Sequence, residues 1–281
     1  MSEAILDAAP SVATIEDKTQ TKKYEEFILL TIGKRLFVIL LVVVAWETAP
    51  RLGLVDRTFL PPLSIILAEF LKMIKSGALI KHVSISLFRS FTGFVIAIII
   101  GIPLGLIVGW YKTAREVLSL PIDVLRNTSP LAMLPVFILF LGIGETSKLT
   151  IVAFACLWPT LLNTISGIKN VDPLLIMLAR SMGLNNAQMF RKIIVPAAIP
   201  SICTGLRLSA ASSVLVIISA EMIGAKSGLG YLIINAQYSF LLPRMYVGII
   251  TTMILGVLIN YLIVGLENKF TSWKPKSNSS K

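Results

Sequence analysis

Few residues of this chain have the types and spacings that catalysis or metal binding requires. Among the 281 residues there is one histidine, His82, so neither a Ser/His/Asp set nor a histidine-based metal site can be assembled. The two cysteines, Cys156 and Cys203, lie in apolar surroundings and are expected to pack rather than to pair or react. The segment GIGETSKLT at 142–150 is superficially like a phosphate loop, but it does not fit the G-x-x-x-x-G-K-[ST] spacing. We therefore expect no catalytic residue, no metal site and no cofactor on this chain, and no residues that hydrolyse a nucleotide.

The composition indicates a membrane protein. Hydrophobic residues make up 55% of the chain, the mean hydropathy is +0.82, and charged residues make up 15%, where a soluble domain would have roughly a quarter. The net charge of +11 and the pI of about 9.8 would suggest nucleic acid as a partner of a soluble protein. In a membrane protein, basic loops set the orientation instead, and no cluster of lysines and aromatics is present. We expect a lipid bilayer and no nucleic acid as partners.

Hydrophobic runs predict an all-α fold with about six transmembrane helices. A polar tail over 1–34 precedes the membrane domain over 35–266, and a Lys- and Ser-rich tail over 267–281 follows it. The segment 61–80 carries charges at helical spacing and is predicted to lie on the membrane surface. The predicted spans are 35–54, the uncharged run between Arg89 and Lys112, the proline-broken segment 121–145, then 149–168, 201–222 and 245–266.

Two spans carry further signals. Gly93, Gly101, Gly105 and Gly109 recur mostly every four residues in the second span, a spacing that favours close helix packing over a substrate-lining role. In the third span, Pro130 and Pro135 are expected to interrupt the helix, and a broken helix at membrane depth is tolerated only where it is buried or faces a watery cavity. Two interpretations of this break remain open: a part of the translocation path, or a packing kink.

The charge distribution predicts which side each end faces. With six spans and both termini cytoplasmic, the inward segments hold 15 of the 26 basic residues and the outward segments hold 8. This bias indicates that the polar segment 171–200 is cytoplasmic, as are both termini.

The segment 171–200 carries more helix-boundary signals than any other part of the chain. Asp172 and Pro173 predict the start of a helix that ends near Met182, where Gly183 supplies a left-handed residue. Asn185 or Asn186 predicts a second short helix that runs through Phe190 and Lys192 and is ended by Pro196. Two short, capped helices between membrane spans indicate a docking element, which we call the coupling loop (171–200).

The residues of the coupling loop resemble a known motif. The run from Ala179 to Gly183, followed by Ile193 and Pro196, is similar to the EAA loop of ABC importer permeases, although Met177 and Leu178 stand where Glu-Ala is usual. The blocks SLFRSFTGF (86–94), PLAMLPVFILFLGIGETSK (130–148), WPTLLNTISGI (158–168) and AEMIGAKSGLGYLI (220–233) extend the resemblance from about residue 60 to 269. Together they resemble the nitrate/sulfonate/bicarbonate/taurine branch of the type I importer permeases.

The resemblance implies a type I (MetI-like) permease in the bacterial inner membrane. The implied partners are two ATP-binding subunits, which carry ATP and Mg, an external substrate-binding protein, and a second copy of the permease. The implied cargo is a small oxyanion-type solute that crosses by alternating access. Residues that would contact the ATP-binding subunit are Ala179, Arg180, Met182, Gly183, Leu184, Asn185, Phe190, Ile193 and Pro196.

An anion crossing a cavity needs hydrogen-bond donors, which hydroxyl groups and broken helix ends can supply. The candidate path residues are Ser129, Pro130, Met133, Asn163, Ser212, Ser213 and Glu221. Glu221 fits this role poorly because a carboxylate repels an anion, so we expect it to anchor the structure or an outer gate. The alternative function is a secondary, ion-coupled transporter, which would need no ATPase but often has a deep carboxylate and inverted repeats, neither of which this sequence displays.

Overall fold

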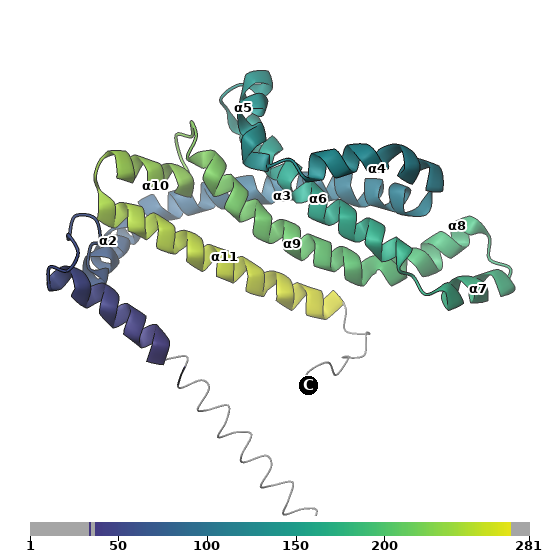
Figure 1. Cartoon of the computed structure of the whole chain (residues 1–281), viewed down its shortest axis with the longest axis horizontal. Helices are drawn as coiled ribbons and strands as arrows, with labels where there is room; N and C mark the ends of the chain where they lie inside the picture. The colour runs from purple at the N-terminus through teal and green to yellow at the C-terminus, as the bar shows by residue number, and fades with distance from the viewer. Residues whose placement is uncertain (1–33, 35–36, 271–281) are drawn as a thin grey trace, which may run out of the picture. The chain divides into compact units, whose positions relative to one another are not determined.

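The computed structural model describes residue 34 and residues 37–270, and the regular elements among them are all helical. The predicted tails at 1–34 and 267–281 lie almost wholly outside the described residues. The described residues divide into two compact units, one that ends at residue 66 and one that begins at residue 67. Element labels follow Figure 1.

The first unit contains a helix over 37–51 and the beginning of α2 (Leu63–Lys75). The outward faces of residues 37–44 are apolar and exposed, as expected of a helix in lipid. Glu47 accepts hydrogen bonds from the N–H and Oγ of Ser64, at 3.1 and 2.9 Å. This carboxylate therefore stabilises the first turn of α2 as a capping residue would.

Three long helices form the centre of the second unit: α3 (Ala78–Trp110), α6 (Glu145–Lys169) and α9 (Val195–Glu221), which run side by side in Figure 1. Glycines let α3 and α6 approach closely. A Cβ on Gly93 would lie 2.6 Å from Val152 Cβ, and one on Gly105 would lie 2.6 Å from Thr164 Cβ. The predicted packing role of the glycine repeat is confirmed.

The predicted third span is two helices rather than one. α4 (Lys112–Arg126) and α5 (Pro130–Leu141) are bent by 98° at a break of three residues. The prediction of a break at Pro130 is confirmed, since this proline is the first residue of α5. The prediction of a break at Pro135 is wrong, because this proline lies inside α5 and the helix continues past it to Leu141. Residues 112–118 (KTAREVL), which the predicted spans leave as a cytoplasmic link, are not an irregular connection. They form an amphipathic helix that also includes Pro121, and Ile122 is its buried residue.

The remaining elements connect or flank the three central helices. α7 (Pro173–Ser181), α8 (Asn186–Met189) and the π-helical turn η1 (Phe190–Ile194) join α6 to α9, and α10 (Leu229–Tyr238) and α11 (Leu242–Phe270) follow. Within the described residues, four helices are long and apolar enough to cross a membrane, or five if the α4–α5 pair counts as one span. The predicted first span at 35–54 is described only from residue 37, as the helix over 37–51.

Candidate coupling loop and distal ion-pair cluster

The first helix of the coupling loop begins as the sequence predicts. The Asp172 carboxylate accepts a hydrogen bond from the N–H of Leu174 at 2.9 Å, and Pro173 is the first helical residue. Capping of this kind stabilises a helix by about 1 kcal/mol. A nine-residue helix has little stability of its own, so this contribution matters for keeping α7 formed.

The end of α7 is a Schellman motif. Gly183 has φ = 69°, its N–H donates to Arg180 O at 3.0 Å, and the N–H of Leu184 donates to Ala179 O at 3.1 Å. These two bonds satisfy carbonyl groups that the helix end would otherwise leave open. The accompanying hydrophobic contact is also present, because Ala179 is fully buried and Leu184 packs against the same cluster.

A complete capping box opens α8. Asn185 Oδ1 accepts from the N–H of Gln188 at 2.8 Å, and Gln188 Oε1 accepts from the N–H of Asn185 at 3.0 Å. Of the two asparagines that the sequence left open, Asn185 is therefore the cap.

The prediction that Pro196 ends the second helix is wrong. The chain continues from α8 through η1 into α9, so that Asn186–Glu221 is one helical segment of 36 residues. The N–H of Val195 donates to Phe190 O, which lies five residues back. This wider π turn makes room for the ring of Pro196, which would clash with the carbonyl of Lys192 in a regular α-helix.

Packing divides the coupling loop into an inner and an outer face. The inner face is a core cluster formed with the ends of the long helices, in which the ring of Phe190 lies 5.2 Å from that of Trp110 of α3. The outer face of α7 is apolar and exposed: Leu174, Met177, Leu178 and Met182 are 59–77% exposed. An apolar helix face held out by a rigid base is the form of a docking surface.

The nine predicted ATPase-contact residues divide between these two faces. Arg180, Met182, Gly183, Asn185 and Pro196 are exposed and remain candidates for direct contact. Ala179 is fully buried, and three further side chains are half-buried: Leu184, Phe190 and Ile193. These four position the loop rather than present a surface.

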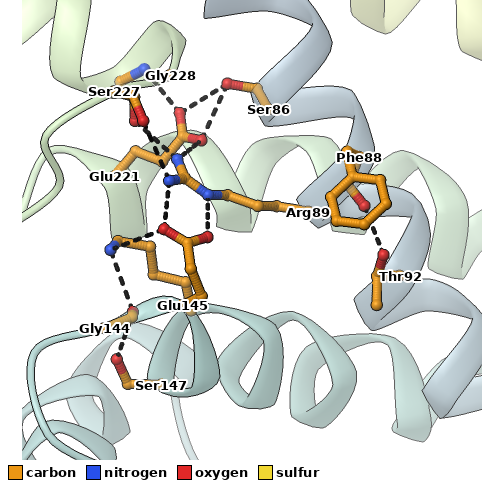
Figure 2. Close-up of polar contacts among 12 residues, drawn as sticks. Ser86, Phe88, Arg89, Thr92, Gly144, Glu145, Ser147, Glu221, Ser227 and Gly228 are labelled. Atoms are coloured by element: carbon orange, nitrogen blue, oxygen red, sulfur yellow. Dashed lines mark hydrogen bonds and ion pairs between the residues drawn. The ribbon is translucent and has the colours of Figure 1, made fainter.

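A second site lies at the ends of α3, α6 and α9 that are remote from the coupling loop. We call Arg89, Glu145, Lys148 and Glu221, with Ser86, the distal ion-pair cluster (Figure 2). The Arg89 guanidinium donates from Nη1 to Glu221 Oε1 at 2.7 Å. It also donates from Nε and Nη2 to the two oxygens of Glu145, both at 2.6 Å. Such bidentate pairs are the strongest and most directional of ion pairs.

Glu221 is fully buried, and every side of its carboxylate is occupied. Ser86 Oγ donates to both oxygens, at 3.0 and 2.8 Å, and the N–H of Gly230 donates to Oε2 at 3.0 Å. Gly228 has φ = 114°, and a Cβ there would lie 2.2 Å from Glu221 Oε1. The loop before α10 therefore wraps around this carboxylate, and the positive end of the α10 dipole stabilises its charge.

The path candidates do not meet at one place. Glu221 belongs to the distal cluster, and Ser213 Oγ is buried 2.7 Å from Ser90 Oγ between α9 and α3. Asn163 donates to Pro159 O at 2.8 Å and packs against Gly205. The Ser212 hydroxyl donates to Leu208 O, and the other three lie at the start of α5: Ser129, Pro130 and Met133. The expectation that Glu221 anchors the structure agrees with its contacts.

Sequence reasoning missed Ser86, Arg89, Glu145 and Lys148 as members of a site. The available signal was position: Arg89 borders a long uncharged run, and Ser86 lies three residues before it on the same helix face. No local pattern connects these residues to Glu221, which lies 132 positions after Arg89.

A bundle of long apolar helices with a capped loop at one end and buried charges at the other is the architecture of an all-α membrane protein. Residues 97–272 match the model of the family described as binding-protein-dependent transport system inner membrane component. The chain belongs to this family.

Named relatives include three transport permeases. The chain is 34% identical over 241 residues to the putative aliphatic sulfonates transport permease protein SsuC of Bacillus subtilis, covering 86% of this chain and 87% of that protein. It is 31% identical over 233 residues to the taurine transport system permease protein TauC of Escherichia coli, covering 81% and 85%. It is 34% identical over 197 residues to the nitrate import permease protein NrtB of Synechocystis, covering 69% and 72%.

Solved structures support the fold. The MetNI methionine ABC transporter in an inward-facing form matches with a TM-score of 0.57 at 20% identity, covering 66% of this chain and 93% of that chain. An amino acid ABC transporter solved with histidines matches with a TM-score of 0.56 at 23% identity, covering 71% and 98%. The predicted all-α importer-permease fold is confirmed.

Proposed function

We propose that this chain is the permease subunit of an ATP-driven importer for a small oxyanion-type solute. The observation that carries the proposal is the coupling loop: a doubly capped helical pair with an exposed apolar face on α7, continuous at its second helix with α9. A separate ATP-binding subunit that receives α7 in a cleft would cover this face.

Rigidity of the loop is what makes coupling possible. Movement of α7 passes to α8 through the Gly183–Asn185 turn, which is fixed by the Schellman bonds and the capping box. From α8 it passes through η1 into α9 without a break in the helix. If the connection were flexible, movement of α7 would only disorder the connecting residues and would not reach α9.

The substrate class and partners follow from similarity. Relatives are named for aliphatic sulfonates, taurine and nitrate, and the sequence resemblance adds bicarbonate. All four are small solutes with an oxyanion group. We propose that two permease copies assemble with two ATP-binding subunits, which carry ATP and Mg, and that an external substrate-binding protein delivers the solute. Both termini would then face the cytoplasm of a bacterial cell.

Uptake into proteoliposomes tests the proposal. The permease is reconstituted with its ATP-binding and substrate-binding proteins, and uptake of labelled nitrate, bicarbonate, taurine and an aliphatic sulfonate is measured with ATP or ADP. We expect uptake of at least one solute that requires both ATP and the binding protein. Uptake driven by an ion gradient without ATP would instead establish a secondary transporter and overturn the proposal.

A further inference from the structure

Two cations of the distal ion-pair cluster are buried, while the acid that they share is exposed. The side chains of Arg89 and Lys148 are 4% and 7% exposed, and that of Glu145 is 61% exposed. The Glu145 carboxylate receives two hydrogen bonds from Arg89 and lies 4.0 Å from Lys148 Nζ. The buried Arg89 and Lys148 side chains thus form an anion site that the Glu145 carboxylate occupies. The site is open to solvent on the side from which Glu145 enters it.

The two acids of the cluster are held very differently. Glu221 is enclosed by Ser86 and by the loop at Gly228 and Gly230, and it has no free direction of movement. Glu145 is the first residue of α6, and its side chain is 61% exposed. Rotation about its own side-chain bonds can therefore withdraw the Glu145 carboxylate from Arg89 into solvent, whereas the fully buried Glu221 side chain has no such space.

The charges of the cluster require an anion at this position. Arg89 and Lys148 balance Glu145 and Glu221 when all four are present. Without the Glu145 carboxylate, a buried positive charge would be left uncompensated, which is strongly unfavourable. Withdrawal of Glu145 is favourable only when another anion takes its place.

We infer that Arg89 and Lys148 form an anion-binding site that Glu145 fills as a tethered anion when no solute is present. The ligand is an anion that offers two oxygens on one centre, as sulfonates, nitrate and bicarbonate do, because the Nε–Nη2 edge of Arg89 binds such pairs. The site lies at the end of the helices remote from the coupling loop, where the solute would enter. That the ligand is the transported solute rests on the proposed function. Glu145 then acts as a gate that the solute displaces.

Anion rescue of a charge-neutral variant tests the inference. The Glu145→Gln permease, in detergent complex with its ATP-binding subunits, is heated in sodium chloride, sodium nitrate or sodium methanesulfonate at equal ionic strength. In chloride we expect a melting temperature about 5 °C below wild type, because Arg89 has lost its exposed partner. Nitrate or methanesulfonate should restore at least half of this loss, and the more effective salt identifies the head group. Glu116→Gln, an exposed acid on α4, is the matched control and should respond as wild type does.

If Glu145→Gln does not accumulate, Glu145→Asp takes its place in the measurement, because it keeps the charge on a shorter side chain. The same salts should restore its melting temperature to a smaller extent. Equal melting temperatures of the substituted protein in all three salts would overturn the anion site. The rescue measurement requires no transport, so it separates the two claims. Rescue together with a wild type that takes up none of the tested solutes would overturn the assignment of the ligand to the transported solute and leave the site in place.

Discussion

Arg89 Nη1 donates to Glu221 Oε1 at 2.7 Å, although the two residues are 132 positions apart in the sequence. Their side chains are 4% and 0% exposed. This ion pair joins α3 to α9 and, through Ser86 and Gly230, fixes the loop that leads into α10. A buried ion pair contributes little net stability by itself, but removal of one partner leaves a buried charge and is costly.

Glu221→Gln should therefore destabilise the protein by about 3 kcal/mol, because Arg89 loses its buried carboxylate. Thermal melting in detergent measures the loss. Glu116→Gln, whose carboxylate is 65% exposed, should change stability by well under about 1 kcal/mol. If Glu221→Gln has the same melting temperature as wild type, the anchoring role is wrong. If uptake per folded molecule is also unchanged, Glu221 leaves the list of path residues.

Gly183→Asp should weaken association with the ATP-binding subunit and reduce uptake, because an aspartate at φ = 69° costs about 1 kcal/mol and loosens the turn. Membrane insertion should be unaffected. Ser181→Asp adds the same charge two residues earlier, at an exposed helical position, and separates charge from backbone geometry. Wild-type co-purification and uptake for Gly183→Asp would contradict the proposed role of the turn.

Leu178→Ser should weaken ATPase association about tenfold without lowering the melting temperature, because this side chain is 59% exposed on the outer face of α7. Pull-down of the ATP-binding subunit, titrated with the variant, measures the affinity. Leu120→Ser on α4, where the leucine is 72% exposed, is the matched control. Equal affinities of the Leu178→Ser and Leu120→Ser variants for the ATP-binding subunit would show that the docking surface lies elsewhere.

Gly105→Val should prevent α3 from packing against α6, because a Cβ at this position would lie 2.6 Å from Thr164 Cβ. We expect a destabilisation of about 3 kcal/mol and low yields of folded protein. Gly256→Val is the control, since the space around Gly256 on α11 is open. Similar yields and melting temperatures for the two variants would show that the helix contact is not tight.

The features that the sequence predicts well are local. Asp172, Gly183 and Asn185 each act on groups within five residues, so their types alone indicate where the helices begin and end. The glycine repeat of α3 also predicts close helix packing, because glycines four residues apart lie on one face of a helix.

The features that it predicts poorly depend on the tertiary structure. Glu145 follows a glycine turn and has no sequence signal that connects it to Arg89, from which it is separated by 56 positions. Pro196 was expected to end a helix, because propensity rules assume regular α-helical hydrogen bonds. In the π turn at Phe190–Ile194 the hydrogen bond joins residues five positions apart, so the assumption does not hold at Pro196. The packed core around Ile194 and Ala198 stabilises this turn.

The unbroken segment Asn186–Glu221 gives the protein a lever. At 1.5 Å per residue, 36 residues span about 54 Å, so a tilt of about 5° about one end displaces the other by roughly 5 Å. Hydrogen bonds such as those of the distal ion-pair cluster do not survive a displacement of that size. A rotation of α8 by a few degrees would thus move the opposite end of α9 far enough to break the contacts of Glu221. A small movement at the coupling loop would therefore release the distal ion-pair cluster.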